Sequence, residues 1–373
     1  MNEKIDSIRK RIDAVDRDIL KAIKKRIELA HDIALCKKKR GENIYWPARE
    51  EKILRRVKKG VSKEESKLIE NIFRTIISTC RSIQRTLKIS YLGPPAAFTH
   101  QAAMKIFGKF CDFIPSLSIN GVFADVAGGK ADYGLVPLQN STDGIDKCTL
   151  DNLISSPLKI INEVFVPLSY GLISKSAKIS AINKIYSHPS VFARCRKYLA
   201  ASLPMAEKIK VASVSEALMT VKAQPAASGA AVIASKFAAE IYKLNILEER
   251  IEDNPGGYTR FLVLGKTAAG KSGYDKTSLL LALKNSWGAL AGVLASFKKR
   301  NVNLPAGVWS INLTKIKSRL SGFLSEKGDS GNLFFAEFEG HIKQKKIRDL
   351  IKELSKLCDS VKILGSFPKG DLS

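Results

Sequence analysis

Hydrophobic side chains recur every three or four positions through the first forty residues, the spacing of one face of an α-helix. Gly41 ends this stretch, and Pro47 suits the first turn of a second helix that runs through Val57. Ser62 is a suitable cap for a third helix that continues to about Leu87. The pattern therefore predicts a three-helix unit with an unusually long first helix. Its apolar positions are Ile5, Ile8, Ile12, Val15, Ile19, Ile23, Ile27 and Ala30.

The length of the first predicted helix has a consequence for assembly. A helix of this length cannot bury its whole apolar stripe against two shorter partners in the same chain. We therefore expect two copies of the chain to pair as an intertwined homodimer.

The hydrophobic period changes at residue 88, where short strand-like runs begin to alternate with helical ones. This alternation is typical of an α/β region. Small and polar residues at 267–276 indicate a linker, after which the elements are predicted in the order βαββαβ, an α+β pattern. An extra stretch at 305–310 is predicted to be a loop. The predicted strands are Tyr133–Leu138, Ile160–Val166, Lys184–Tyr186, Lys208–Val211, Ala230–Ile233, Arg260–Leu264, Ser278–Leu283, Leu333–Phe338 and Val361–Ile363.

Composition is that of a multidomain globular protein. The 373 residues are 45% apolar, enough for two or three domains with cores of their own. The first residues carry charges where a secretion signal has an apolar run, and no apolar run is long enough to span a membrane. We expect a cytoplasmic protein. The six cysteines are scattered without metal-ligand spacing, so no metal site is expected.

The formal net charge of +26 raises nucleic acid as a partner, because clustered Lys and Arg bind phosphate. Here the basic residues are spread over every segment instead of gathered in one stripe. A general bias towards lysine explains this distribution more simply than nucleic-acid binding does. A basic surface would also attract small dicarboxylate substrates.

The N-terminal helices carry polar residues that a plain helical bundle does not need. Arg26 and Lys37 are eleven positions apart, so on one continuous helix they return to nearly the same face three turns apart. Long cations on an inward face predict a buried anion.

With these residues in place, the first 88 positions resemble the helical chorismate mutases. Residues 89–266 resemble prephenate dehydratase, and residues 277–373 resemble an ACT regulatory domain. This order matches the bifunctional P-proteins of phenylalanine biosynthesis. The resemblance implies an all-α mutase unit, two α/β lobes with a cleft between them, and an α+β domain, with no cofactor.

In the mutase unit, the resemblance implies a reaction that needs neither nucleophile nor metal. Chorismate rearranges to prephenate when its two carboxylates are held and charge on its ether oxygen is stabilised. The similarity assigns Arg9 (reaching across the dimer) and Arg26 to the carboxylates, and Lys37 and Gln84 to the ether oxygen. Arg49 and Glu50 match a substrate-binding pair, in which Glu50 accepts the substrate hydroxyl.

In the α/β region, the Thr-Arg-Phe motif of prephenate dehydratases is matched by Thr259-Arg260-Phe261. The threonine is the expected donor that protonates the departing hydroxyl of prephenate. Companion motifs strengthen the match, and the resemblance places Asn140, Ser141, Ser187, Arg260 and Phe261 at the substrate.

The cleft departs from the family pattern at several positions. The family's Gly-Pro-Glu-Gly-Thr is replaced by Gly93-Pro94-Pro95-Ala96-Ala97. Four single positions elsewhere also differ from the residues that are usual in the family: an amide, a hydroxyl, a cation and a glycine stand there, in that order. These are Gln139, Ser190, Arg194 and Gly257.

The ACT resemblance implies an amino-acid site at a dimer interface, formed by Gly288, Ala289 and Leu290 with Ser318 and Arg319 of a second segment. L-Phenylalanine is the implied effector. The second segment reads Lys317-Ser318-Arg319-Leu320, so a cation replaces a carboxylate and a proline is lost. The alternative is an ACT domain that mediates dimerisation and binds no effector.

Three hypotheses follow. The first is a bifunctional enzyme that converts chorismate to prephenate and prephenate to phenylpyruvate. The second keeps only the mutase active, and the third is a basic ligand-binding or nucleic-acid-associated protein without turnover. Assay of chorismate loss and phenylpyruvate formation separates the three.

Overall fold

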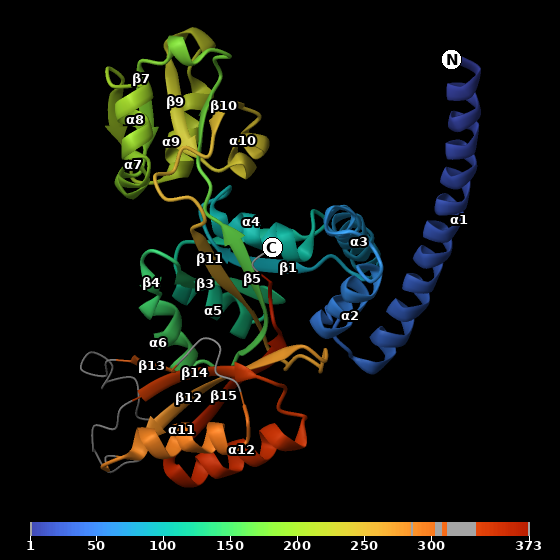
Figure 1. Ribbon diagram of the computed structural model, residues 1–373, viewed down its shortest axis with the longest axis vertical. Coiled ribbons are helices and arrows are strands. Elements are labelled where there is room, and N and C mark those ends of the chain that lie inside the picture. The colour runs from blue at the N-terminus through green and yellow to red at the C-terminus, as the bar shows by residue number, and fades with distance from the viewer. Residues whose placement is uncertain (1, 285, 303–307, 312–332, 372–373) are drawn as a thin grey trace. The chain divides into compact units, whose positions relative to one another are not determined.

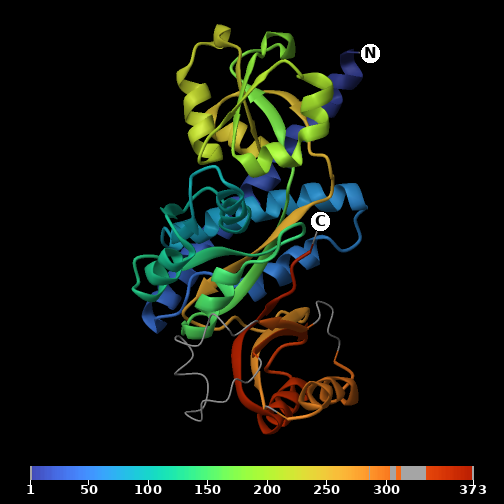
Figure 2. The ribbon, with the colours of Figure 1, turned by 90° about the vertical axis from the view of Figure 1, so that its left-hand side faces the viewer.

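The computed structural model describes residues 2–284, 286–302, 308–311 and 333–371 (Figures 1 and 2). The chain forms two compact units. One comprises Met1–Leu87 with Phe107–Asp112, and the other comprises Lys88–Ile106 with Phe113–Ser373.

The first unit consists of the three predicted helices, α1 (Asn2–Arg40), α2 (Pro47–Val57) and α3 (Lys63–Gln84). Ser62 and Glu65 form a capping box at the start of α3, in which each side chain accepts a hydrogen bond from the other residue's backbone N–H. Gly41 follows α1 with a φ of +63°, a conformation that glycine adopts at little cost. The prediction of a three-helix unit is confirmed, with α3 ending three residues earlier than expected.

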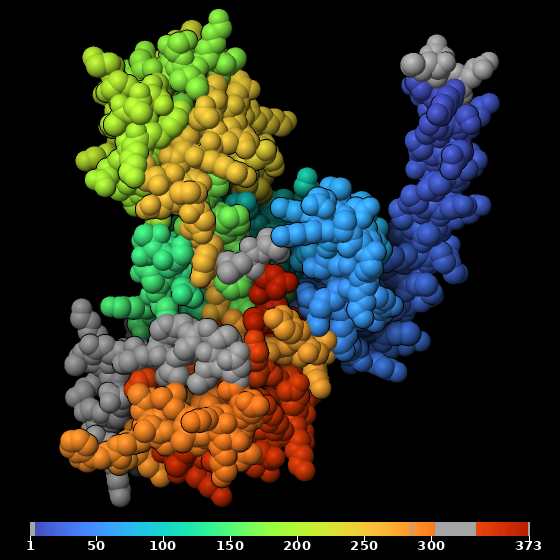
Figure 3. Space-filling view, viewed as in Figure 1, coloured from blue at the N-terminus to red at the C-terminus, as the bar shows by residue number. Residues whose placement is uncertain are grey.

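Much of the apolar stripe on α1 is left open. Figure 3 shows the N-terminal part of α1 extending past α2 and α3. Within the described chain, the five apolar side chains of this part of the stripe are between 44% and 57% exposed. They are Ile5, Ile8, Ile12, Val15 and Ile19.

The second unit begins with sheet A, whose strands lie in the order β2-β1-β3-β11-β5, with β4 paired to β3. Strand β11 lies between β3 and β5 and is antiparallel to both, so a late segment of the chain completes the middle of an early sheet. The strands are β1 (Lys88–Leu92), β2 (Asp112–Ser116), β3 (Tyr133–Asn140), β4 (Gly144–Ile145), β5 (Lys159–Pro167) and β11 (Tyr258–Gly265). The accompanying helices are α4 (Phe98–Phe107), α5 (Ile119–Ala127) and α6 (Lys147–Ser155).

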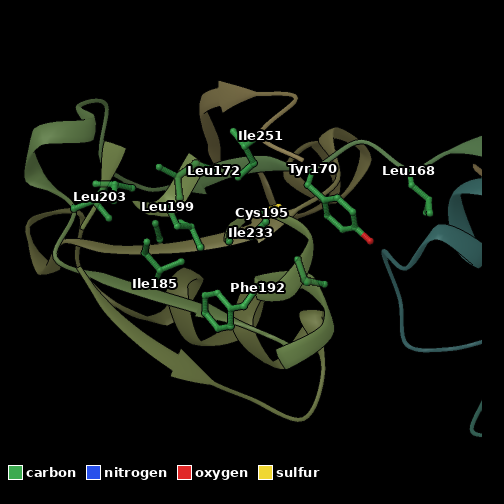
Figure 4. Packing of buried hydrophobic residues seen from close by; sticks show 13 residues of the cluster. Leu168, Tyr170, Leu172, Ile185, Phe192, Cys195, Leu199, Leu203, Ile233 and Ile251 are labelled. Atoms are coloured by element: carbon green, nitrogen blue, oxygen red, sulfur yellow. The ribbon is translucent and has the colours of Figure 1, made fainter. Parts of the chain in front are cut away.

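Sheet B has the order β10-β6-β9-β7-β8 and carries helices on both faces. Ala231 and Ile233 of β9 pack with α7 and α8, whereas the alternate residues Ala230 and Val232 pack with α9 and α10. Figure 4 shows the first of these two cores, with Tyr170 at its edge. The strands are β6 (Gly171–Ser174), β7 (Lys184–Ser187), β8 (Glu207–Lys210), β9 (Ala230–Ala234) and β10 (Asn245–Glu249). The helices are α7 (Pro189–Arg194), α8 (Arg196–Ser202), α9 (Val214–Ala223) and α10 (Lys236–Tyr242).

Two connections join the lobes that are built on sheets A and B, and they lie side by side. The backbone N–H of Leu168 donates to the carbonyl of Gly257 at 2.8 Å, and that of Ile251 donates to the carbonyl of Tyr170 at 3.0 Å. The predicted α/β region thus consists of two lobes.

The C-terminal part of the second unit is an antiparallel sheet, sheet C, in the order β13-β14-β12-β15, with two helices. Its elements follow one another as βαββαβ. They are β12 (Asp275–Leu283), α11 (Ala289–Lys299), β13 (Val308–Ile311), β14 (Leu333–Glu339), α12 (Lys345–Leu357) and β15 (Cys358–Pro368).

Two expectations for this part were wrong. Residues Asp275 and Lys276, assigned to the linker, begin β12 and are both buried. Val308–Ile311, which overlaps the expected loop, pairs with β14 as an edge strand. In the first place two polar residues concealed the start of a strand, and in the second a short strand followed residues typical of a loop. In both, pairing with a neighbouring strand decided the outcome.

None of the described helices is long and apolar enough to cross a membrane.

Two neighbouring residues of α9 provide a test of the packing of sheet B. Leu218 is fully buried, and Met219 is 57% exposed. Leu218→Ala should lower the free energy of unfolding by about 2–5 kcal/mol, because it leaves a cavity. Met219→Ala, on the same helix, should change it by less than about 0.5 kcal/mol. Urea unfolding of the two variants measures both values, and equal losses would contradict the packing described here.

Candidate functional sites

The helical unit has a cavity of about 490 Å³, open to solvent on one side, between α1, α2 and α3. Apolar side chains line part of it, and five of the six predicted polar mutase residues line the rest. The lining residues are Arg26, Leu29, Ala30, Ile33, Lys37, Ile44, Trp46, Arg49, Glu50, Ile53, Ile77, Cys80, Arg81 and Gln84.

Arg26 and Lys37 both reach the cavity from α1, as their helical spacing predicts. The Arg26 guanidinium donates to the carbonyl of Ile76 at 3.2 Å. The Lys37 ammonium donates to the carbonyl of Ile44 at 2.9 Å and lies 5.2 Å from the centre of the Trp46 ring. These contacts hold two cations at the wall of one cavity.

Burial lowers the pKa of Lys37, and the carboxylates of Glu42 and Glu50 act in the opposite direction. The lysine therefore loses its charge at a lower pH than an exposed lysine does. A half-buried cation whose close contacts are a carbonyl and an aromatic ring is suited to receive an anion.

Glu50 enters the cavity from α2 and is bound to Arg81 of α3, with Oε1 and Nη1 2.7 Å apart. The Arg81 guanidinium also donates to the carbonyl of Phe107 at 2.8 Å and lies 5.0 Å from the centre of the Tyr45 ring. Burial raises the pKa of the Glu50 carboxyl, and the adjacent Arg81 lowers it. Arg81 thus keeps Glu50 oriented and favours its ionised form.

Gln84 completes the cavity near the end of α3. Its amide nitrogen donates to the carbonyl of Cys80 at 3.4 Å, and its buried amide oxygen has no hydrogen-bond partner among the described residues. A ligand in the cavity could satisfy the amide, whose oxygen and nitrogen exchange places on rotation.

The structure does not bring Arg9 to this cavity. Arg9 lies on the exposed part of α1 and pairs with Asp6 at 3.3 Å. Its predicted role requires the cavity of a second copy.

The second cavity has a volume of about 510 Å³ and lies between the lobes of sheets A and B. Its lining is strongly polar and includes two arginines and three carboxylates. The lining residues are Thr142, Asp143, Leu168, Tyr170, Ser190, Ala193, Arg194, Arg196, Glu252, Asp253, Asn254 and Gly257.

Thr259 and Asn140 are opposite each other on β11 and β3, close in sequence to lining residues Gly257 and Thr142. The Asn140 amide nitrogen donates to the Thr259 hydroxyl oxygen at 3.3 Å. The Asn140 oxygen accepts from the backbone N–H of Thr142 at 2.9 Å, which orients the amide. Among the described residues the Thr259 hydroxyl acts only as an acceptor, so its proton is available for donation.

Ser141 lies beside this pair, and its hydroxyl accepts from the backbone N–H of Tyr258 at 2.9 Å. Neither Ser141 nor the Thr259–Asn140 pair lines the cavity itself.

Three further residues predicted at the substrate are buried away from the cleft. The Ser187 hydroxyl donates to the carbonyl of Ile233 at 3.2 Å, and Phe261 is packed in the core of sheet A. The Arg260 guanidinium is 2% exposed and is bound to Glu163 and Glu337. Substrate contact by these three residues therefore stays a prediction. On β11, Arg260 faces the side opposite to Thr259, because neighbouring residues of a strand face opposite sides.

The departures from the family pattern lie at the cleft and near it. Arg194 forms an ion pair with Asp143 at 2.7 Å and also donates to the Thr142 hydroxyl at 3.2 Å, which joins the two lobes. At Gly257 an added Cβ would meet only ordinary contacts, the nearest at 3.5 Å, so alanine would fit there. Ala96 has a φ of +64°, a conformation that suits the family's glycine better than alanine.

In the C-terminal part, Gly288 has a φ of +77° and is the N-cap of α11, where Ala289 and Leu290 begin the helix. Leu290 is 38% exposed. Ser318 and Arg319 lie outside the described residues.

Comparison with known proteins identifies both the helical and the α/β part of the chain. The family model for chorismate mutase type II matches residues 8–85, and that for prephenate dehydratase matches residues 89–269. The chain is 38% identical to a bifunctional chorismate mutase/prephenate dehydratase of Aquifex aeolicus over 98% of each chain. A protein of the same description from Pseudomonas aeruginosa is 34% identical over 99% of each chain.

A solved structure agrees with the fold of the second unit. The prephenate dehydratase of Arthrobacter aurescens in complex with L-Phe has a TM-score of 0.65 and 28% identity, covering 77% of this chain and 91% of that one.

The fold and the two cavities define a class of enzyme architecture in which a helical mutase unit is followed by a two-lobed α/β unit. The chain belongs to the bifunctional chorismate mutase/prephenate dehydratase family of phenylalanine biosynthesis. It is accordingly both an isomerase and a lyase, which supports the first of the three hypotheses over the other two.

Sequence reasoning missed Arg81 and the partners of Arg260. Arg81 shares the inward face of α3 with Ile77 and Gln84, so a charge within an apolar stripe could have revealed it. Glu163 and Glu337 are carboxylates that stand between apolar residues in mainly apolar strands, which is the same kind of clue. Their partners could not be identified from the sequence because they come from distant segments.

Arg81→Met should move the acid limb of the mutase pH profile to higher pH. Glu50 must be ionised to accept a hydrogen bond, and its ionised form is lost as pH falls through its raised pKa. Loss of Arg81 raises that pKa further. Measurement of kcat/KM for chorismate against pH checks this. Arg81→Lys retains the charge and should leave the limb near its original position, and an unmoved limb in Arg81→Met would contradict the assignment.

Proposed function

We propose that the helical cavity rearranges chorismate to prephenate and that the cleft between the lobes converts prephenate to phenylpyruvate. The observation that carries this proposal is the convergence of Arg26, Lys37, Arg49, Glu50 and Gln84 on one cavity from three helices.

In the mutase cavity, Arg26 and Arg49 bind substrate carboxylates. Lys37 and Gln84 donate to the ether oxygen, where negative charge grows as the carbon–oxygen bond breaks. Glu50, oriented by Arg81, accepts the substrate hydroxyl. A second copy packed against the half-exposed Leu29 and Ile33 of α1 would exclude water from the cavity, which would strengthen these charge interactions.

The active mutase is a homodimer in which Arg9 of each chain completes the cavity of the other. Two features support this: the exposed apolar stripe of α1, and the position of Arg9 on that same exposed part of the helix. A second copy packed along the stripe would cover apolar side chains that the described chain leaves open.

In the dehydratase cleft, Thr259 donates a proton to the departing hydroxyl group of prephenate, while Asn140 orients the threonine. Loss of carbon dioxide supplies the electrons that form the aromatic ring, and the protonated hydroxyl leaves as water. Arg194 and Arg196 are the cations available for the substrate carboxylates, and Arg194 would exchange Asp143 for substrate. This replacement offers a reason for the unusual arginine at position 194.

The C-terminal βαββαβ part is an ACT domain that binds L-phenylalanine near Gly288, Ala289 and Leu290, with Ser318 and Arg319. The relative from Arthrobacter aurescens, whose structure holds L-Phe, supports this ligand. An ACT domain that only assembles the enzyme is the alternative, given Lys317 and Leu320. The enzyme is expected in the cytoplasm.

The two activities should be separable by single substitutions. Lys37→Ala should lower mutase kcat by about 10²-fold or more, because it removes a donor to the charged oxygen, and should leave phenylpyruvate formation from prephenate intact. Thr259→Val should do the reverse, with a dehydratase loss of about 10²-fold. Steady-state assays with chorismate and with prephenate measure both. Unchanged mutase kinetics in Lys37→Ala would refute the cavity assignment.

The shared cavity can be tested by mixing variants. Arg9→Ala and Arg26→Ala should each abolish most mutase activity. After unfolding and joint refolding, mixed dimers regain one intact cavity, so the mixture should recover roughly a quarter of wild-type activity. Each variant refolded alone is the control. No recovery in a mixture that light scattering shows to be dimeric would place Arg9 outside the partner's cavity.

A further inference from the structure

Four charged side chains meet in one buried cluster between sheet A and sheet C. Glu163 of β5 and Arg260 of β11 come from sheet A, and Lys276 of β12 and Glu337 of β14 come from sheet C. None of the four side chains is more than 6% exposed. We call these residues the charge cluster.

Arg260 is the centre of the charge cluster. Its Nε lies 2.6 Å from Glu163 Oε2, and its two terminal nitrogens lie 2.6 and 2.7 Å from the two oxygens of Glu337. Lys276 lies 3.0 Å from Glu163 Oε2, so two cations balance two anions. The paired contacts to Glu337 fix the guanidinium in direction as well as in position.

A buried ion pair is weak evidence for stability, because desolvation of the charges offsets much of their attraction. A buried ion pair does, however, fix the relative positions of the two side chains. Any movement of Arg260 relative to Glu337 would break paired hydrogen bonds inside the protein, where water cannot replace them.

Arg260 directly follows Thr259, so the charge cluster holds the backbone that carries the threonine. The ladder between β11 and β3 is irregular at this point, with a register shift between Arg260 and Phe261. On its other edge β11 pairs regularly with β5 through Thr259 and Arg260, so the interruption affects only the side that faces β3. The charge cluster adds a side-chain attachment at the point where the ladder with β3 is interrupted.

We propose that Arg260 and Glu337 are positioning residues for the dehydration of prephenate, which hold the Thr259 hydroxyl at the substrate through the backbone of β11. Sheet C thereby contributes to the competence of a cleft that it does not line. This inference rests on the proposed role of Thr259.

Glu337→Gln in the full-length chain tests the proposal. It should lower dehydratase kcat at least tenfold while KM for prephenate changes by less than about twofold, because the donor and not the binding site is displaced. Mutase kcat of the same preparation should be unchanged. Glu339→Gln is the matched control, since it makes the same change on β14 at a more exposed ion pair with Lys369. It should leave dehydratase kcat unchanged.

A double variant separates positioning from stability. Arg260→Gln with Glu337→Gln leaves Lys276 and Glu163 as a balanced pair, so the temperature of unfolding should rise above that of Glu337→Gln alone. Dehydratase kcat should stay low, because the charged contacts between β11 and sheet C are then lost. Recovery of kcat together with stability would overturn the proposal.

Two further variants cover the remaining outcomes. If Glu337→Gln yields no folded protein, Arg260→Lys retains the charge but loses the paired contact and should still lower kcat with KM unchanged. Wild-type kcat in that variant would overturn the inference. Wild-type dehydratase kcat in Thr259→Val would refute the role of the threonine. A strong loss of dehydratase kcat in Thr259→Val, with no loss in Glu337→Gln, would refute only the positioning role of the charge cluster.

Discussion

The structure depends on one constraint, that a charge can leave water only where another charge or a set of dipoles replaces it. Glu50 is buried beside Arg81, and Arg260 is buried between Glu163 and Glu337. Lys37 is the informative exception, because its close contacts are a carbonyl and an aromatic ring, and burial lowers its pKa. The cavity therefore retains positive charge for which the bound substrate is the natural partner.

The two units bring their polar residues together in different ways. In the helical unit, each helix contributes cations or acceptors at helical spacing, so the site is an extension of the inward faces that form the bundle. In the second unit, β11 returns to the middle of sheet A after the chain has built sheet B. That return aligns Thr259 with Asn140 on one side and directs Arg260 to the other, and it brings the connections between the lobes together.

The structure shows which contacts and backbone conformations the residues that depart from the family pattern adopt. Arg194 joins the lobes through its ion pair with Asp143 and brings a cation to the cleft. Gly257 leaves space next to Ser141, and Ala96 adopts a backbone conformation that a glycine would adopt with less strain. The changes at Arg194 and Gly257 alter the charge and shape of the cleft, whereas Ala96 lies in the core of sheet B.

The sequence by itself determined the helical unit, the alternation of strands and helices that follows it, and which side of the first helix carries Arg26 and Lys37. Helical spacing is local, so Arg26 and Lys37 could be placed on one face without knowledge of any partner. Only the tertiary structure decided that Arg81 binds Glu50, that Ser187 and Phe261 are buried, and that Arg260 binds sheet C. A strand pattern shows that neighbouring residues face opposite sides, but the packing of distant segments decides which side meets substrate and which meets a second sheet.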